Sequence, residues 1–325
     1  MDGEGTESNP YLIESIEDLV FFAQDVKGGN TYENKYVKLT TSLNFKADTS
    51  YINPYIENFC GYNGTLKNAL TTGDGFHGIG SILQNEECNF HGNFNGNNCI
   101  ISNLFMNTTQ NTESGVGLFS YNYGTIYNIG LDGININATF GANVPGTMFV
   151  GGLVGRNEGI ISCVFTKGEI TSKYTERRNS NIRTGGICGQ ITSGKIENSY
   201  NVAKISTRDN YGTSTTIGGC VGTLSTDAEL INCYNIGIIE ESNNKKILKG
   251  GIVGSNSQLT ATVENCYYLD EICLTGIGTH IGSSDDEENL NKTVEYMKSK
   301  DFVNLLNPKC FKLRENDYPI LYWQE

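Results

Sequence analysis

Gly-Gly-Leu-Val-Gly at residues 151–155 recurs three times along the chain, as Gly-Gly-Ile-Cys-Gly at 185–189, Gly-Gly-Cys-Val-Gly at 218–222 and Gly-Gly-Ile-Val-Gly at 250–254. The steps between the copies are 34, 33 and 32 residues. A degenerate copy, Val-Gly-Leu-Phe-Ser, precedes them at 116–120. A nearly fixed period of this size indicates a repeat architecture.

Two further short segments follow each glycine-rich copy. The second segment reads Thr-Ile-Tyr-Asn-Ile at 125–129, Gly-Ile-Ile-Ser-Cys at 159–163, Lys-Ile-Glu-Asn-Ser-Tyr at 195–200, Glu-Leu-Ile-Asn-Cys-Tyr at 229–234 and Thr-Val-Glu-Asn-Cys-Tyr at 262–267. The third lies at 168–170, 203–205 and 237–239. Three β-prone pieces per unit, separated by Gly, Asn and Ser, are too short and too rich in turns for helices.

These units predict an all-β fold, a parallel β-helix (solenoid) with three short strands per coil and about 33 residues per repeat. A propeller blade would need four strands per unit. Successive coils of a solenoid lie about 4.8 Å apart, the spacing of strands in any sheet. Equivalent residues of successive repeats therefore stack into columns.

Two such columns are expected from the second segment. One holds core-filling residues: Cys163, Cys233 and Cys266, with Ser199 and Ile129 at the equivalent places. The other comes one position earlier and holds polar residues at a bend: Asn128, Ser162, Asn198, Asn232 and Asn265. Free cysteine packs as a small apolar side chain, and stacked asparagines hydrogen-bond along a solenoid. Disulfides between neighbouring coils are the alternative for the cysteines.

Both ends of the chain predict α-helical caps on one elongated domain. Residues 14–27 fit a helix with Ser15 as N-cap and glycines after its end. Residues 291–306 offer a second helix. The expected organisation is an N-terminal capping segment over 1–35, a β-helix over 36–280, and a C-terminal helical cap with a closing strand over 281–325, because an open solenoid end exposes unpaired edges.

The overall charge narrows the functional classes. The net charge of −13 argues against nucleic-acid binding, because contacts to phosphates need clustered Lys and Arg. No apolar run is long enough to span a bilayer, so no membrane insertion is expected. The first residues, MDGEGTESNP, lack the positive end and apolar stretch of a signal peptide, so none is expected in this chain.

The repeat resembles the GLUG motif of bacterial cell-surface right-handed β-helix proteins. The Gly-Gly-Leu-Val-Gly … Asn-Cys-Tyr pattern carries the resemblance over 115–270, and the stretch at 90–104 is similar to the segment that precedes those repeats. Such motifs occur in adhesin-like proteins and in IgA-peptidase-type surface proteins. The resemblance implies a right-handed coil and an extracellular or cell-surface location. The motif is a packing unit, so it implies little about activity.

Few residues are candidates for chemistry. The acidic run Asp285, Asp286, Glu287 and Glu288 is expected to be a solvated loop, with a loose Ca²⁺ site as the alternative, because carboxylate oxygens suit that ion. The basic run at 173–178 is expected to be solvated too, with contact to anionic glycans as its alternative. No catalytic residues and no cofactor are predicted.

Tyrosines form a subtler pattern around the second segment, at Tyr121, Tyr123, Tyr200, Tyr234, Tyr267 and Tyr268. An outward row of such rings would suit binding of a glycan or protein, because aromatic faces stack on sugars and anchor interfaces. The same rings would equally serve to pack loops against the wall of the solenoid. Both interpretations stay open at this point.

The functional hypothesis is a non-catalytic cell-surface adhesion or interaction module, or a structural stalk. Its expected partner is a host or surface glycan or protein, and it could act as an oligomer. The first alternative is a polysaccharide-active β-helix enzyme, either a lyase or a glycoside hydrolase. The second is a surface component of a virion or phage tail, since trimeric β-helices serve there.

Overall fold

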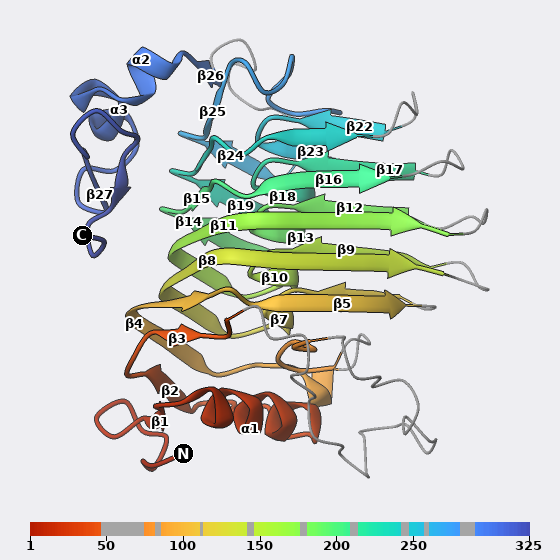
Figure 1. Cartoon of the computed structure of the whole chain (residues 1–325), viewed down its shortest axis with the longest axis vertical. Helices are drawn as coiled ribbons and strands as arrows, with labels where there is room; N and C mark the ends of the chain where they lie inside the picture. The colour runs from red at the N-terminus through yellow and green to blue at the C-terminus, as the bar shows by residue number, and fades with distance from the viewer. Residues whose placement is uncertain are drawn as a thin grey trace.

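The computed structural model describes residues 1–46, 75–81, 86–110, 113–141, 146–175, 181–208, 214–241, 247–256, 260–279 and 290–325. Three parallel sheets wind around one apolar core and form a solenoid (Figure 1). This confirms the predicted fold class.

The two smaller sheets carry the glycine-rich segments and have five strands each. One sheet contains β6 (Ser114–Val116), β9 (Thr147–Gly151), β12 (Asn181–Gly185), β17 (Ser214–Gly218) and β22 (Ile247–Gly250). The other contains β7 (Phe119–Asn122), β10 (Val154–Asn157), β13 (Cys188–Ile191), β18 (Val221–Leu224) and β23 (Val253–Asn256). Each strand pairs in parallel with its equivalent in the next repeat, so the columns predicted from the sequence exist.

The large sheet takes up the second and third segments. Its path follows β1 (Tyr11–Ile13), β2 (Tyr36–Leu39), β4 (Asn93–Ser102), β8 (Thr125–Phe140), β11 (Ile160–Tyr174), β15 (Tyr200–Asn201), β20 (Tyr234–Asn235), β25 (Tyr267–Leu269) and β26 (Asn291–Lys292). Shorter strands pair beside that path: β3 (Leu43–Asn44), β5 (Phe105–Gln110), β14 (Gly194–Glu197), β16 (Lys204–Arg208), β19 (Ala228–Ile231), β21 (Ile239–Glu241) and β24 (Thr262–Glu264).

The paired glycines allow a sharp corner between the two smaller sheets. A Cβ on Gly186 would lie 2.2 Å from Cγ of Asn201 and 2.4 Å from the carbonyl oxygen of Gly219. Both contacts are far inside van der Waals distance, and one of them is to backbone. Because the same corner recurs in each coil, the glycine motif recurs with it.

The core column of the second segment differs from its prediction at one rung. Phe165 pairs with Tyr200, so Val164, not Cys163, aligns with Ser199 and with the buried Cys233. Cys163 lies one position earlier, with a φ of 54°. The alignment of the repeats by residue identity was wrong by one position in this coil, because the left-handed turn, and not the cysteine, defines the equivalent residues.

That turn position forms the asparagine column. The φ values at this position lie between 49° and 56°, at Asn128, Asn198, Asn232 and Asn265. In the coil of β11 the position is held by Cys163 and not, as predicted, by Ser162. The Asn265 amide donates to Oδ1 of Asn232, and the Asn232 amide donates to Oδ1 of Asn198, each at 3.2 Å. Asparagine tolerates this conformation better than other residues with side chains, so the predicted ladder is confirmed with Cys163 as its exception.

A helix covers the N-terminal end of the solenoid. Helix α1 (Ile16–Lys27) begins after Ser15, whose hydroxyl accepts from the Asp18 amide at 3.1 Å, as the sequence predicted. Phe22 on its buried face packs against Phe90 and Phe94 of the first coil. In the described part of the chain, no helix has the length and apolar character to cross a membrane.

The C-terminal residues 290–325, here called the C-terminal strap, lie along the flank of the solenoid (Figure 1). The expected single helix over 291–306 is instead two short ones, α2 (Val294–Met297) and α3 (Lys300–Leu305). Ser299 interrupts them, because its hydroxyl accepts from the Phe302 amide and starts the second helix. Two antiparallel strands follow, β27 (Phe311–Lys312) and β28 (Ile320–Leu321).

Candidate functional site

The acidic run Asp285, Asp286, Glu287 and Glu288 lies outside the described residues, so its Ca²⁺ hypothesis stays a prediction. Across the part of the chain that the structure describes, no three His, Cys, Asp or Glu side chains gather as metal ligands would.

Four of the aromatic residues near the second segment are register partners on the outside of the solenoid wall. Phe165, Tyr200, Tyr234 and Tyr267 belong to a cluster separate from the main core. The rings of Phe165 and Tyr200 lie 5.4 Å apart at 14°, and those of Tyr200 and Tyr234 lie 4.9 Å apart and parallel. We call this column the aromatic ladder.

The C-terminal strap covers the aromatic ladder. Phe302 packs edge-on against Tyr234 at 5.7 Å and against Tyr267 at 5.6 Å. The Tyr200 hydroxyl donates to Oε1 of Gln324 at 2.9 Å, and the Tyr234 hydroxyl donates to the carbonyl of Pro319. Tyr200, Tyr234 and Tyr267 are therefore 4%, 0% and 8% exposed, and their ring faces already have partners within the chain.

The other three tyrosines do not extend this ladder. Tyr268 is buried against Gly251. Tyr123 is half-buried and stacks on His91 at 4.7 Å. Tyr121 is 1% exposed. The accessible row of rings that one interpretation of the sequence expected is not formed, because five of the six rings are buried and the sixth is stacked on a neighbour.

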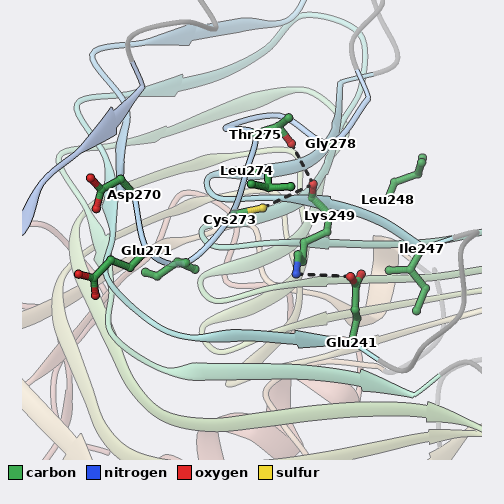
Figure 2. Close-up of a pocket in the computed structure, with 11 residues that line it drawn as sticks. Glu241, Ile247, Leu248, Lys249, Asp270, Glu271, Cys273, Leu274, Thr275 and Gly278 are labelled. Carbon is green, nitrogen blue, oxygen red and sulfur yellow. Dashed lines mark hydrogen bonds and ion pairs between the residues drawn. The ribbon is translucent and has the colours of Figure 1, made fainter.

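A depression of about 460 Å³ is lined by residues of β21, β22 and the segment that follows β25 (Figure 2). It lies at the opposite end of the solenoid from α1 (Figure 1). The Lys249 ammonium pairs with the Glu241 carboxylate at 3.4 Å. Figure 2 shows Asp270 and Glu271 on the far side, pointing away from that pair. Hydrolysis of a glycosidic bond needs two carboxylates facing one point, which these side chains do not provide.

A different cluster occupies the corner between the two smaller sheets, and we call it the arginine corner: Tyr121, Phe149, Arg156, Arg183 and Gln190. Phe149 and Arg183 are register partners in one sheet. Arg156 is the register partner of both Tyr121 and Gln190 in the other. The outward positions of the two sheets meet across the corner, as the 2.9 Å hydrogen bond between Thr216 and Thr223 in a later coil demonstrates.

The two arginines of this corner differ in their partners. Arg156 donates from Nη2 to Glu158 at 2.9 Å and from Nε to the Thr192 hydroxyl at 2.5 Å. Arg183 forms no ion pair or hydrogen bond among the described residues. Burial lowers the pKa of its guanidinium, while Glu113 opposes that shift. Arg183 therefore carries a positive charge that no acceptor of the described chain contacts at hydrogen-bond distance.

An aromatic ring and an unsatisfied hydroxyl complete the arginine corner. The guanidinium carbons of Arg156 and Arg183 lie 5.7 and 5.6 Å from the centre of the Phe149 ring. The buried Tyr121 hydroxyl has no hydrogen-bond partner within the described chain. Burial, followed by the nearby Glu113 carboxylate, raises its pKa, so it stays a neutral donor. Buried polar groups without a protein partner are rare in native proteins, and a water or a bound group commonly satisfies them.

Sequence reasoning missed this corner because its residues do not repeat. The available signal was the register itself. Phe149 and Arg183 each precede a Gly-Gly pair by two positions, and Arg156 and Gln190 each follow the third glycine of the motif. Aligned repeats thus predict one outward cluster, although they do not predict that its members approach each other across the corner.

Comparison with known proteins supports the fold and leaves the family open. No family model matches the chain. Halomucin of Haloquadratum walsbyi is 27% identical over 188 residues, which make up 58% of this chain and only 2% of halomucin. A crystal structure from Bacteroides ovatus, described as a "putative immunoglobulin A1 protease", superposes with a TM-score of 0.58 at 17% identity and covers 99% of this chain and 95% of that one. The chain therefore shares its β-solenoid fold with that Bacteroides protein and distant sequence similarity with a small part of halomucin.

Proposed function

We propose that this protein is a non-catalytic interaction module of a cell-surface or secreted protein, and that the arginine corner binds an acidic group of a glycan or protein. The observation that carries the proposal is the positive charge of Arg183, which has no ion pair or hydrogen bond within the described chain and lies over the Phe149 ring. The Tyr121 ring contacts the same Phe149, and its hydroxyl is unsatisfied. The description of the Bacteroides relative names an immunoglobulin, which is an extracellular protein, and this favours the proposed location.

The chemistry of the corner favours a carboxylate or sulfate as the bound group. A guanidinium offers planar, paired donors that match such groups. Phe149 gives the ligand an apolar face, and Gln190 and Thr192 lie within the same corner. A net charge of −13 repels long polyanions, so the site favours one acidic group on an otherwise neutral ligand.

Titration of the full chain with glucuronate, and with glucose as the uncharged counterpart, tests this function by calorimetry or NMR. Only the acid should bind, and Arg183→Gln should weaken binding about tenfold or more, as expected for loss of one charge-assisted contact. Lys167→Gln is the matched control, because Lys167 is exposed on the large sheet and pairs with Asp132.

Three results would contradict the proposal. Equal binding of the acid and the neutral sugar would remove the role of charge. Unchanged binding by Arg183→Gln would place the site elsewhere. Release of new reducing ends or unsaturated products from an acidic polysaccharide would show that the protein is an enzyme.

A further inference from the structure

The C-terminal strap brings two cysteines together that are far apart in the sequence. Cys163 lies in β11, and Cys310 lies between α3 and β27. Both pack against the apolar cluster between the strap and the wall, and each thiol influences the pKa of the other. Both are only partly buried, whereas Cys233 and Cys266, the neighbouring thiols of the core, are fully buried. Reagents in solution therefore have a path to the first pair.

Contacts on both sides hold the two cysteines in place. The indole of Trp323 donates to the carbonyl of Cys163 at 3.3 Å. The Asn307 amide donates to Sγ of Cys310 at 3.4 Å and to Oδ1 of Asn198 at 2.9 Å. Asn198 occupies the position of Cys163 in the next coil, so the strap and the wall are tied together on either side of the thiols.

Packing alone does not account for a cysteine at residue 163. The equivalent turn position of other described coils is asparagine, at Asn128, Asn198, Asn232 and Asn265. Asparagine is the residue suited to a φ near 54°, and it would continue the hydrogen-bonded ladder. Cysteine gives up both advantages at a coil that packs against Cys310 of the strap.

We infer that Cys163 and Cys310 form a disulfide that fastens the C-terminal strap to the solenoid when the protein meets an oxidising environment. The inference depends only on the strap and stands apart from the function of the arginine corner. The oxidant is a small-molecule disulfide such as oxidised glutathione. One cysteine thiolate attacks it, forms a mixed disulfide and releases one glutathione thiolate.

The second cysteine then attacks the mixed disulfide at the protein sulfur and releases the second glutathione. Two protein thiols are oxidised, one external disulfide is reduced to two thiols, and the two protons pass to the released thiolates. Burial raises the pKa of both thiols, that of Cys163 to about 12. At Cys310 the interaction with Cys163 partly offsets the effect of burial, so Cys310 is the better first nucleophile. Because the thiolate reacts, the rate should rise with pH.

The test treats the reduced full-length chain with oxidised glutathione, blocks free thiols with iodoacetamide and maps peptides by mass spectrometry without reduction. A peptide linking residues 163 and 310 is expected, together with slower amide hydrogen exchange in α3 and β27. Cys273→Ser, which removes another partly buried thiol, should leave both results unchanged.

Cys163→Asn keeps the test interpretable, because asparagine fits the ladder and the variant should fold. It should lose the cross-link and the slower exchange. Separate glutathione adducts or alkylation of both cysteines in the oxidised, folded wild-type chain would overturn the inference. A link between Cys310 and a different cysteine would overturn it as well.

Discussion

At the scale of single residues, the left-handed turn of each coil is the position where identity matters most. For a residue other than glycine, this left-handed conformation usually costs about 1–2 kcal/mol of conformational free energy. Asparagine lowers that cost and adds hydrogen bonds to both neighbouring coils, as Asn232 does to Asn198 and Asn265. The ladder therefore specifies the register between coils as well as their stability.

Asn232→Ala should lower the free energy of unfolding by about 2–4 kcal/mol, because alanine loses two hydrogen bonds and adds left-handed strain. Asn232→Gly should cost about 1–2 kcal/mol less, because glycine adopts the conformation freely and loses only the hydrogen bonds. Urea denaturation measures both. If the two variants are equally stable, backbone strain does not explain the asparagine column.

At the scale of elements, the C-terminal strap is held in position by its packing on one surface, the aromatic ladder. Phe302, Phe311 and Trp323 pack onto the aromatic ladder, and their contacts span several coils. Both helices of the strap are too short to be stable alone. The strap is therefore ordered by its tertiary contacts, and its order should depend on the ring packing.

Phe302→Ala should destabilise the strap by about 3–5 kcal/mol, as expected for emptying a buried aromatic site. Phe21→Ala is the matched control, because Phe21 on α1 is 54% exposed, and it should cost less than about 0.5 kcal/mol. Hydrogen exchange in α3 and β27 measures the effect locally. Exchange as slow as in the wild type would show that Phe302 does not hold the strap.

Elements differ in how far the sequence predicted them. Helix α1 was predicted with its N-cap because the capping signals are local. The glycine repeat predicted the sheets, since a corner without room for Cβ dictates glycine. The strap was predicted as an end cap, but it lies on the flank. The sequence of an apolar helix face predicts that the face is buried, but not against which surface. That the surface is the aromatic ladder, beginning at Phe165, is visible only in the folded structure.

The candidate site was less predictable than the fold. The tyrosines were noticed, yet whether a ring is free depends on residues such as Gln324, which lies far away in the sequence. The arginine corner was missed because Arg156 and Arg183 belong to different coils and different sheets. Their proximity is a property of the coil geometry rather than of any local motif.

At the scale of the whole molecule, many phenol groups are enclosed, and this makes stability depend on alkaline pH. Burial raises the pKa of Tyr267 and Tyr268 to about 12, from the ordinary 10.0 of an exposed tyrosine. Burial also raises the pKa of Tyr234 well above that value. Above about pH 10 the folded state thus holds more protons than the unfolded state.

The part of the free energy of unfolding that these phenols contribute should therefore be fully retained below about pH 10 and should fall as the pH rises towards the folded values. Urea midpoints between about pH 8 and about pH 11 measure this slope, and near-ultraviolet absorbance of phenolate follows the ionisation. Tyr234→Phe should flatten the slope, while Tyr322→Phe, at a residue 58% exposed, should leave it unchanged. A slope that is the same in all three proteins would contradict the role of the buried phenols.

The parallel stacking of one repeat on the next has a consequence for how such a chain changes in length. Removing or duplicating a unit of about 33 residues, cut at the same point of two coils, restores every column on both sides of the junction. A change of a few residues inside a strand instead turns inward side chains outward along the rest of the coil. Gene duplication and protein engineering can therefore lengthen or shorten this fold only by whole repeats. Each added repeat brings two further outward positions to the corner where Arg156 and Arg183 lie.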